Sequence, residues 1–241
     1  WAFGYNGTGQ LGDGTTNQSL LPIQIGNDHG WNSISAGFEF SLAVRAPGTI
    51  WSWGFNGNGQ LGIGSTSNSD VPVQIGSSQD WMLIEGGPSY GFAINTNGEL
   101  FGWGYNGNGQ LGTGNTSQQN DPIQIGTETN WQEISGAAGA ISGGTVYGTH
   151  SLGLQWPNYS ICSTGSNYVG QLGDNTNDQS VYFNCITGEL NVGIEEVVTD
   201  INFSIIPNPS NGLFTVNVES LNSSNYICKV IDAIGKSQGF S

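Results

Sequence analysis

The chain has 241 residues, of which only 9% are charged, and its formal net charge at pH 7 is −15. Its only Lys and Arg residues are Arg45, Lys229 and Lys236, so nucleic acids and anionic membranes are poor partners, because binding to both depends on such cations. No apolar run reaches about 18 residues, so no transmembrane helix is predicted. Aromatic residues make up 11% of the chain. This content argues against disorder, and the short apolar runs between turn signals favour an all-β fold.

The first distinctive segment is GTGQLG at 7–12, which recurs as GNGQLG at 57–62 and 107–112. It fits the glycine pattern of dinucleotide-binding loops, which connect a buried strand to the N-terminus of a helix. However, the residues after Gly62 are Gly, Ser, Thr, Asn and Pro, which favour turns and cannot start an amphipathic helix. No Lys follows the glycines, so a Walker loop is excluded as well. We therefore predict no nucleotide and no other cofactor.

These segments belong to a tandem repeat with a period of 50 residues. Trp31, Trp81 and Trp131 follow this spacing. A fourth Gln-Leu-Gly comes 61 residues after the third, within YVGQLG at 168–173, so the third unit carries about 11 extra residues. We expect them in the glycine-rich stretch 136–150.

Within one unit the apolar runs predict four short strands, at 51–54, 71–75, 81–85 and 91–94, with equivalents 50 residues to either side. Four such strands in each tandem unit are typical of the blades of a β-propeller. The tryptophans at the start of the third strand are expected to pack within a blade.

The residues WGFNGNGQLG at 53–62, followed by a polar loop and VPVQI at 71–75, resemble the regulator-of-chromosome-condensation repeat. That resemblance implies a β-propeller, normally of seven blades. It covers 1–188, as units 1–50, 51–100 and 101–161 and a partial unit 162–188. The predicted fold is therefore all-β: a partial propeller of four-stranded blades, with three units and part of a fourth. Because these units cannot close such a ring, we expect either that further blades precede this sequence or that it forms an open arc.

The resemblance gives the loop residues structural roles. The glycines are expected to let the backbone adopt positive φ and pass close to the neighbouring blade. The leucines of Gln-Leu-Gly are expected to fill the core. Asn6, Asn56 and Asn106 suit Asx-turns that hold each loop.

After the repeats, residues 189–202 are acidic and are predicted to form a linker. In 203–241, turn signals separate alternating β runs, which predicts a small, truncated antiparallel β-sandwich. The segments IIPNPSNGLFTVNVE and KVIDAIGK resemble the C-terminal sorting domain of type IX secretion (Por) in the Bacteroidota. That resemblance implies export by the type IX machinery, with a secreted or surface-attached product; the alternative is an ordinary β-sandwich appendage. The expected sorting motif is Pro207, Asn208, Pro209, Asn211 and Gly212.

No catalytic constellation stands out, and we predict that the chain is not an enzyme. His29 is alone in a turn, and His150 occupies the slot of Phe40 and Tyr90, where a planar group that fills a blade is expected. No Ser or Cys has an assignable base, and no pair of carboxylates is singled out for glycoside hydrolysis.

Metal binding is not predicted either. Loop carboxylates suit Ca²⁺ in principle, but they match no calcium motif and are predicted to be solvated. Cys162, Cys185 and Cys228 lack metal-ligand spacing. A Cys162–Cys185 disulfide and unpaired buried thiols remain alternatives at this point. The candidate calcium residues are Asp13, Asp70, Asp121, Asp174 and Asp178.

The predicted function is binding of a protein partner by a secreted or surface-displayed propeller. Successive connections of an antiparallel blade alternate between its two ends, so loop 55–70 shares a face with turn 86–90. Aromatic anchors within a polar rim dominate many interfaces. The alternatives are a carbohydrate-binding or glycan-cleaving propeller and, for the aromatics, packing against neighbouring blades. The predicted binding residues are Tyr5, Phe55, Tyr105, Phe38, Pro88 and Tyr90.

Overall fold

A computed structural model of the chain describes residues 1–27, 30–137, 140–142, 145–147, 149–157, 159–186, 201–207, 214–220, 230–231 and 237–238. All the regular elements in these segments are strands. The chain divides into two compact units, Trp1–Thr187 and Gly188–Ser241, which are described separately. No helix long and apolar enough to cross a membrane is found in the described segments.

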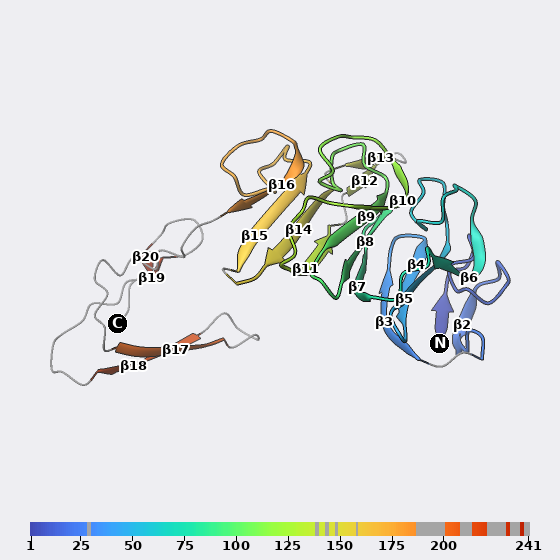
Figure 1. Cartoon of the computed structure of the whole chain (residues 1–241), viewed down its shortest axis with the longest axis horizontal. Coiled ribbons are helices and arrows are strands. Elements are labelled where there is room, and N and C mark those ends of the chain that lie inside the picture. The colour runs from blue at the N-terminus through green and yellow to red at the C-terminus, as the bar shows by residue number, and fades with distance from the viewer. Residues whose placement is uncertain are drawn as a thin grey trace. The chain divides into compact units, whose positions relative to one another are not determined.

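Three four-stranded antiparallel sheets, the first, second and third blades, form the body of the first unit (Figure 1). A two-stranded sheet, the N-terminal strand pair, precedes them. This architecture confirms the predicted all-β fold of propeller blades. The N-terminal strand pair consists of β1 (Ala2–Gly4) and β2 (Ser19–Ile23). The first blade is β3 (Trp31–Ala36), β4 (Phe40–Arg45), β5 (Thr49–Gly54) and β6 (Ser69–Ile75). The second is β7 (Trp81–Gly86), β8 (Tyr90–Asn95), β9 (Leu100–Gly104) and β10 (Gln119–Gln124). The third is β11 (Trp131–Gly136), β14 (His150–Gln155), β15 (Ser160–Gly165) and β16 (Ser180–Ile186).

The blades are offset from the sequence repeat by half a unit. In unit 51–100, β5 and β6 complete the first blade, whereas β7 and β8 begin the second. Each blade therefore combines the last two strands of one unit with the first two strands of the next. Units 51–100 and 101–161 each span two neighbouring blades, and unit 1–50 supplies β1 and β2 to the N-terminal strand pair and β3 and β4 to the first blade.

The hydrophobic core lies between facing blades, because each sheet buries apolar side chains against the next. One cluster joins Phe40, Leu42 and Val44 of the first blade to Ile84 of the second. A second cluster joins the second and third blades. The leucines of all four Gln-Leu-Gly segments are buried, as predicted, and burying each one contributes about 1.5–3 kcal/mol. These leucines are Leu11, Leu61, Leu111 and Leu172.

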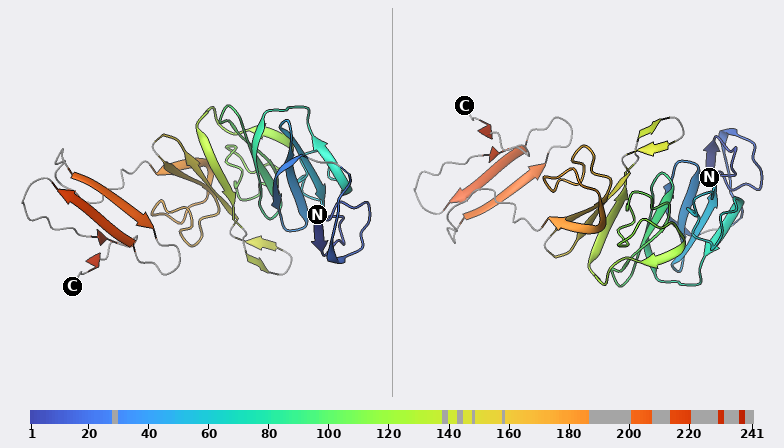
Figure 2. Two further views of the ribbon diagram at one scale, coloured as in Figure 1. Left: turned by 90° about the horizontal axis from the view of Figure 1, so that it is seen from below. Right: turned by 90° about the horizontal axis from the view of Figure 1, so that it is seen from above.

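The extra residues of the third unit lie where the sequence indicated. They form a hairpin of β12 (Ala140–Ser142) and β13 (Thr145–Tyr147) within the connection from β11 to β14. Figure 2 shows this hairpin standing away from the blades.

The second unit contains short antiparallel pairs. β17 (Ile201–Pro207) pairs with β18 (Phe214–Ser220), and Pro207 lies opposite Phe214. β19 (Val230–Ile231) pairs with β20 (Ser237–Gln238). Of the predicted sorting motif, Pro207 ends β17, and the other four residues lie outside the described residues, as does His29 of the first unit.

Candidate functional site

The long loops and the short inner turns meet at one end of the strands, which we call the loop face. In the first blade the N–H of Phe55 donates to the carbonyl of Glu39 in the β3–β4 turn (2.8 Å). In the second blade the N–H of Tyr105 donates to Ser89 in the same way (2.9 Å). Figure 1 shows the long loops along one edge of the unit. The loop face comprises loops 5–18, 55–68, 105–118 and 166–179 and turns 37–39 and 87–89.

A single buried asparagine holds each long loop. Asn56 Oδ1 accepts from the N–H of Leu61 (2.9 Å), and its Nδ2 donates to the carbonyls of Ser65 (2.8 Å) and Ser67 (2.9 Å). Asparagine thus bridges residues on both sides of the loop, a longer-range role than the predicted Asx-turn. The equivalent side chains are also fully buried and accept from the leucine N–H in the same way: Asn6, Asn106 and Asn167.

The glycines let the neighbouring blade pack onto the loop. Gly62 has a φ of +67°, and a Cβ there would lie 2.8 Å from Cδ1 of Trp103 in the next blade. Trp103 Nε1 donates to the carbonyl of Gln60 (2.9 Å). Trp53 makes the equivalent bond to Gln10 (2.9 Å). The predicted close approach of loop and blade is therefore confirmed, and the glycine pattern belongs to a blade contact.

Four of the six predicted binding residues are accessible on the loop face. Tyr5 and Phe38 are each 64% exposed. Phe55 and Tyr105 are half-buried. The ring of Phe55 lies over Gly57 of its own loop, where a Cβ would meet its Cζ at 2.5 Å, and Tyr105 covers Gly107 in the same way.

Tyr90 and Pro88 are buried, so the prediction that they lie on an exposed binding surface is wrong. Tyr90 starts β8, which lies between β7 and β9, and its side chain enters the core between the second and third blades. Its hydroxyl donates to the carbonyl of His150 (3.0 Å) and accepts from Ser151 Oγ (3.3 Å). Burial raises the pKa of Tyr90 above its ordinary value. Tyr90 therefore joins two blades.

Two exposed residues were not assigned from the sequence. Tyr168 and Val169, at the tip of the third blade's long loop, are 65% and 85% exposed. They stand where the other loops have Gly-Asn or Gly-Thr. Ser166 occupies the position of Phe55. Because no aromatic ring covers position 168, a side chain fits there. The loop of the third blade therefore carries its aromatic residue at the tip, whereas the other loops carry theirs at the base. In the sequence, this difference is indicated by residues 166 and 168, which both depart from the repeat.

Two of the carboxylates considered for calcium, those of Asp13 and Asp174, accept hydrogen bonds within their own loops. Asp13 Oδ1 accepts from Asn6 Nδ2 (3.1 Å) and from the N–H of Thr15 (3.0 Å). Burial alone would raise the pKa of Asp13, but the hydrogen bonds from Thr15 and Asn6 outweigh it and lower the pKa. Asp70 and Asp121 lie in strands β6 and β10. Among the described residues, no group of three or more His, Cys, Asp or Glu side chains could hold a metal ion.

The sequence profile of the regulator of chromosome condensation (RCC1) repeat matches residues 1–44, 47–94 and 97–140. The chain belongs to the RCC1-repeat family. A second RCC1-repeat profile matches residues 31–60. Comparison with curated proteins gave no match.

Solved structures share the fold of this RCC1-repeat chain. The crystal structure of human WBSCR16 has a TM-score of 0.64 at 22% identity, and the match covers 84% of this chain and 50% of that one. Prp20p from Saccharomyces cerevisiae, described with its binding properties to Gsp1p and histones, gives 0.64 at 16% identity and covers 83% and 47%. Yeast RCC1 (Prp20) bound to Kap60 gives 0.63 at 15% identity and covers 90% and 48%. The chain spans about half the length of these structures.

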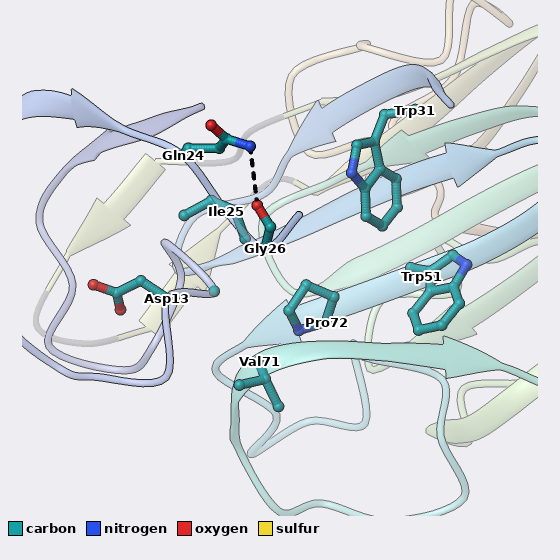
Figure 3. Close-up of a pocket in the computed structure, with 9 residues that line it drawn as sticks. Asp13, Gln24, Ile25, Gly26, Trp31, Trp51, Val71 and Pro72 are labelled. Atoms are coloured by element: carbon teal, nitrogen blue, oxygen red, sulfur yellow. Dashed lines mark hydrogen bonds between the residues drawn. The ribbon is translucent and has the colours of Figure 1, made fainter. Parts of the chain in front are cut away.

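The RCC1-repeat unit also has two cavities at equivalent positions between blades. The first, of about 290 Å³, lies between the N-terminal strand pair and the first blade (Figure 3). The second, of about 230 Å³, lies between the second and third blades. Two residue pairs, Gly12 with Gly112 and Trp31 with Trp131, are each 100 residues apart and line the two cavities. The cavities are therefore related by two repeat units.

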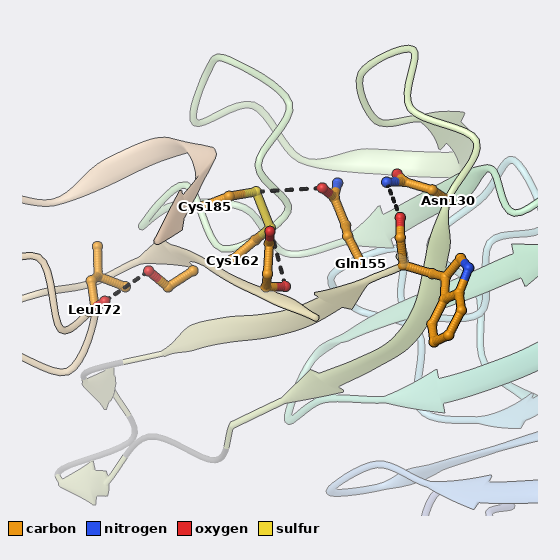
Figure 4. Close-up of a disulfide and its surroundings, with 8 residues drawn as sticks. Asn130, Gln155, Cys162, Leu172 and Cys185 are labelled. Carbon is orange, nitrogen blue, oxygen red and sulfur yellow. Dashed lines mark hydrogen bonds between the residues drawn. A yellow bond between two sulfur atoms is a disulfide. The ribbon is translucent and has the colours of Figure 1, made fainter. Parts of the chain in front are cut away.

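A disulfide joins the two outer strands of the third blade. Cys162 of β15 and Cys185 of β16 are directly opposite in the register, and their sulfurs are bonded (Figure 4). The sequence left two alternatives open, a Cys162–Cys185 disulfide and unpaired buried thiols, and the structure has the disulfide. Cys162 stands where Trp51 stands in the first blade, so the bond replaces an aromatic ring beside the second cavity.

Proposed function

We propose that this RCC1-repeat chain is a non-catalytic module that binds a protein partner through its loop face. The observation that carries the proposal is the exposed pair Tyr168-Val169 at a loop tip, where the other loops have Gly-Asn or Gly-Thr. Tyr5 and Phe38 add exposed aromatic rings at the same end of the strands. A few aromatic anchors within a polar rim supply most of the binding energy in many interfaces.

The loops that carry these anchors are ordered before a partner arrives. Asn167 Oδ1 accepts from the N–H of Leu172 (2.9 Å), and its Nδ2 donates to the carbonyl of Thr176 (3.0 Å). A preorganised surface loses little conformational entropy on binding, which favours affinity. The same asparagine that shapes the fold therefore also favours recognition.

The net charge of the chain indicates which kind of protein surface it would bind. The first unit contains one Lys or Arg, Arg45, at the end of β4 opposite the loop face. With a net charge of −15, the chain favours a partner whose surface is rich in Lys and Arg, because complementary charge speeds association and selects partners. The binding of Prp20p to Gsp1p and histones shows that one protein of this fold binds proteins, which supports the proposal by analogy of fold.

A pull-down tests this proposal: the full chain is immobilised and captures proteins from the medium of the source organism or from its host. Tyr168→Ala combined with Phe38→Ala should lose the retained partner, because truncating a hot spot costs about 2 kcal/mol or more, roughly 30-fold in Kd. Asn97→Ala, in the exposed β8–β9 turn at the opposite end, is the matched control. Retention should also fall as salt rises.

The proposal fails if the double variant retains the same proteins as the wild type, or if the control variant loses them equally. The melting temperature of each variant is measured in parallel. Because both replaced rings are mostly exposed, it should change little.

We further propose that the protein is exported, with residues 203–241 as a type IX sorting signal. Two features support this: the segment IIPNPSNGLFTVNVE and the Cys162–Cys185 disulfide, since disulfides persist in oxidising compartments. Fusing the complete tail to a periplasmic reporter should carry the reporter outside a type IX-competent host. Retention of the intact fusion in the periplasm would contradict the assignment.

A further inference from the structure

The cavity between the N-terminal strand pair and the first blade has the features of a small-ligand site. Two tryptophan rings, Trp31 and Trp51, form its walls, with centroids 6.1 Å apart and planes at 83° (Figure 3). Its volume of about 290 Å³ is at the low end for small-ligand pockets, which span about 300–1,000 Å³. The space therefore suits one small ring system.

A cavity also occurs at the equivalent position between two complete blades. The second cavity, at the equivalent position, lies between two complete four-stranded blades. A hollow thus persists where both neighbouring sheets have all four strands. The first cavity differs from it in having Trp51 as a wall, where the second has the Cys162–Cys185 bond.

Polar groups beside the rings can bond a hydroxyl. Trp51 is fixed by donation from its Nε1 to Thr49 Oγ1 (2.9 Å). Trp31 Nε1 has no acceptor among the described residues, and Figure 3 shows it on the ring edge that faces Gln24 and Gly26. Gln24 Nε2 donates to the carbonyl of Gly26 (3.2 Å), which leaves its Oε1 as an acceptor. The cavity therefore offers one donor and one acceptor next to two apolar surfaces.

The charged groups of the chain disfavour ionic ligands. The guanidinium carbon of Arg45 lies 5.7 Å from the Trp31 centroid and 5.6 Å from the Trp51 centroid, so a cationic ligand would have to compete with Arg45 for these rings. An anionic ligand would approach a chain of net charge −15. The Asp13 carboxylate is turned away from the rings toward its own loop (Figure 3), where Thr15 donates to it.

We infer that this cavity binds a neutral saccharide residue. Its C–H face would stack on one of the two tryptophan rings, and the perpendicular second ring would contact its edge. Its hydroxyl groups, each both donor and acceptor, would bond Trp31 Nε1 and Gln24 Oε1. A neutral sugar ring has one apolar face and polar edges. It therefore matches the apolar tryptophan surfaces, the donor, the acceptor and the preference for an uncharged ligand. The inference is independent of the loop face, so either can fail alone.

The test is calorimetric titration of the full chain with neutral gluco-, manno- and chito-oligosaccharides, with galacturonate and tetramethylammonium as charged controls. At least one neutral saccharide should bind. Trp51→Ala should weaken this binding at least ten-fold. Trp31→Phe, which keeps the ring but removes the donor, should weaken it several-fold at an unchanged melting temperature. Trp156→Ala, at a half-exposed tryptophan of the third blade, should leave it unchanged.

Three results would overturn the inference. These are no binding by any neutral saccharide, a preference for either charged control, and neutral binding that neither Trp51→Ala nor Trp31→Phe weakens. If Trp51→Ala lowers the melting temperature, Trp31→Phe decides the question.

Discussion

Replacing Asn56 tests how the loops are held. The side chain is fully buried and makes three hydrogen bonds, with the N–H of Leu61 and the carbonyls of Ser65 and Ser67. Asn56→Ala leaves all three backbone groups without this partner. At about 1–1.5 kcal/mol for each bond, the expected loss is about 3–4.5 kcal/mol. This is a large part of the roughly 5–15 kcal/mol that stabilises a typical domain.

Asn56→Asp gives the sharper comparison. A carboxylate still accepts from Leu61 but cannot donate to Ser65 or Ser67, and it places a negative charge against their carbonyl oxygens. We therefore expect Asn56→Asp to be at least as destabilising at pH 7 as Asn56→Ala. Asn58→Ala is the matched control, because the bonded group of Asn58 is its backbone N–H, which donates to Gln60 Oε1 (2.9 Å); it should change stability by less than about 0.5 kcal/mol.

The assay is urea unfolding of the full chain followed by tryptophan fluorescence. All 8 Trp residues lie in the first unit, so the signal reports on the blades. If Asn56→Asp proved more stable than Asn56→Ala, or if Asn58→Ala were as damaging as either, the assigned role of Asn56 would be refuted.

Three further predictions concern the contacts within and between blades. Trp103→Phe replaces a fully buried indole with a smaller phenyl ring and removes the Nε1 bond to Gln60. It should cost about 2–4 kcal/mol in urea unfolding, whereas Trp156→Phe should be near neutral. Burial raises the pKa of Glu85 above 4.5 despite donation from Ser35. The folded state is therefore favoured by the protonated form of Glu85. The free energy of unfolding should fall as pH rises from 4.5 through the raised pKa. Glu85→Gln should flatten this fall, and a pH profile of unfolding that the substitution leaves unchanged would contradict the prediction. Replacing both Cys162 and Cys185 with Ser opens a loop of sequence separation 23 and should cost about 3 kcal/mol in non-reducing unfolding, a difference that a reducing agent should abolish.

Most strands were predictable because the repeat presents the same short apolar runs three times. The strands expected at 71–75 and 81–85 are β6 and β7. Their pairing was not predictable, since the repeat shows which segments are strands but not where one sheet ends. The half-unit offset follows from the sheet pairing, in which β5 and β6 join the sheet of β3 and β4.

The candidate site was predicted in part, for a similar reason. Sequence spacing places Tyr90 beside a turn of the loop face, but it does not show that the first residue of an inner strand points into the neighbouring blade. Tyr168 was not predicted to bind, because it stands at a position that is glycine in the other units. Its exposure depends on Ser166, two residues earlier, which leaves position 168 uncovered.

The central claim, that the loop face binds a protein, is tested most directly by site-specific photo-crosslinking. A photoreactive amino acid is placed at Tyr168 in one full-length variant and at Asn97, in the opposite turn, in another. With the partner mixture of the pull-down, the variant at position 168 should give a discrete crosslinked protein that unlabelled wild-type chain competes away, and the variant at position 97 should not. Equal crosslinking at both positions, or crosslinking at position 97 alone, would contradict the account.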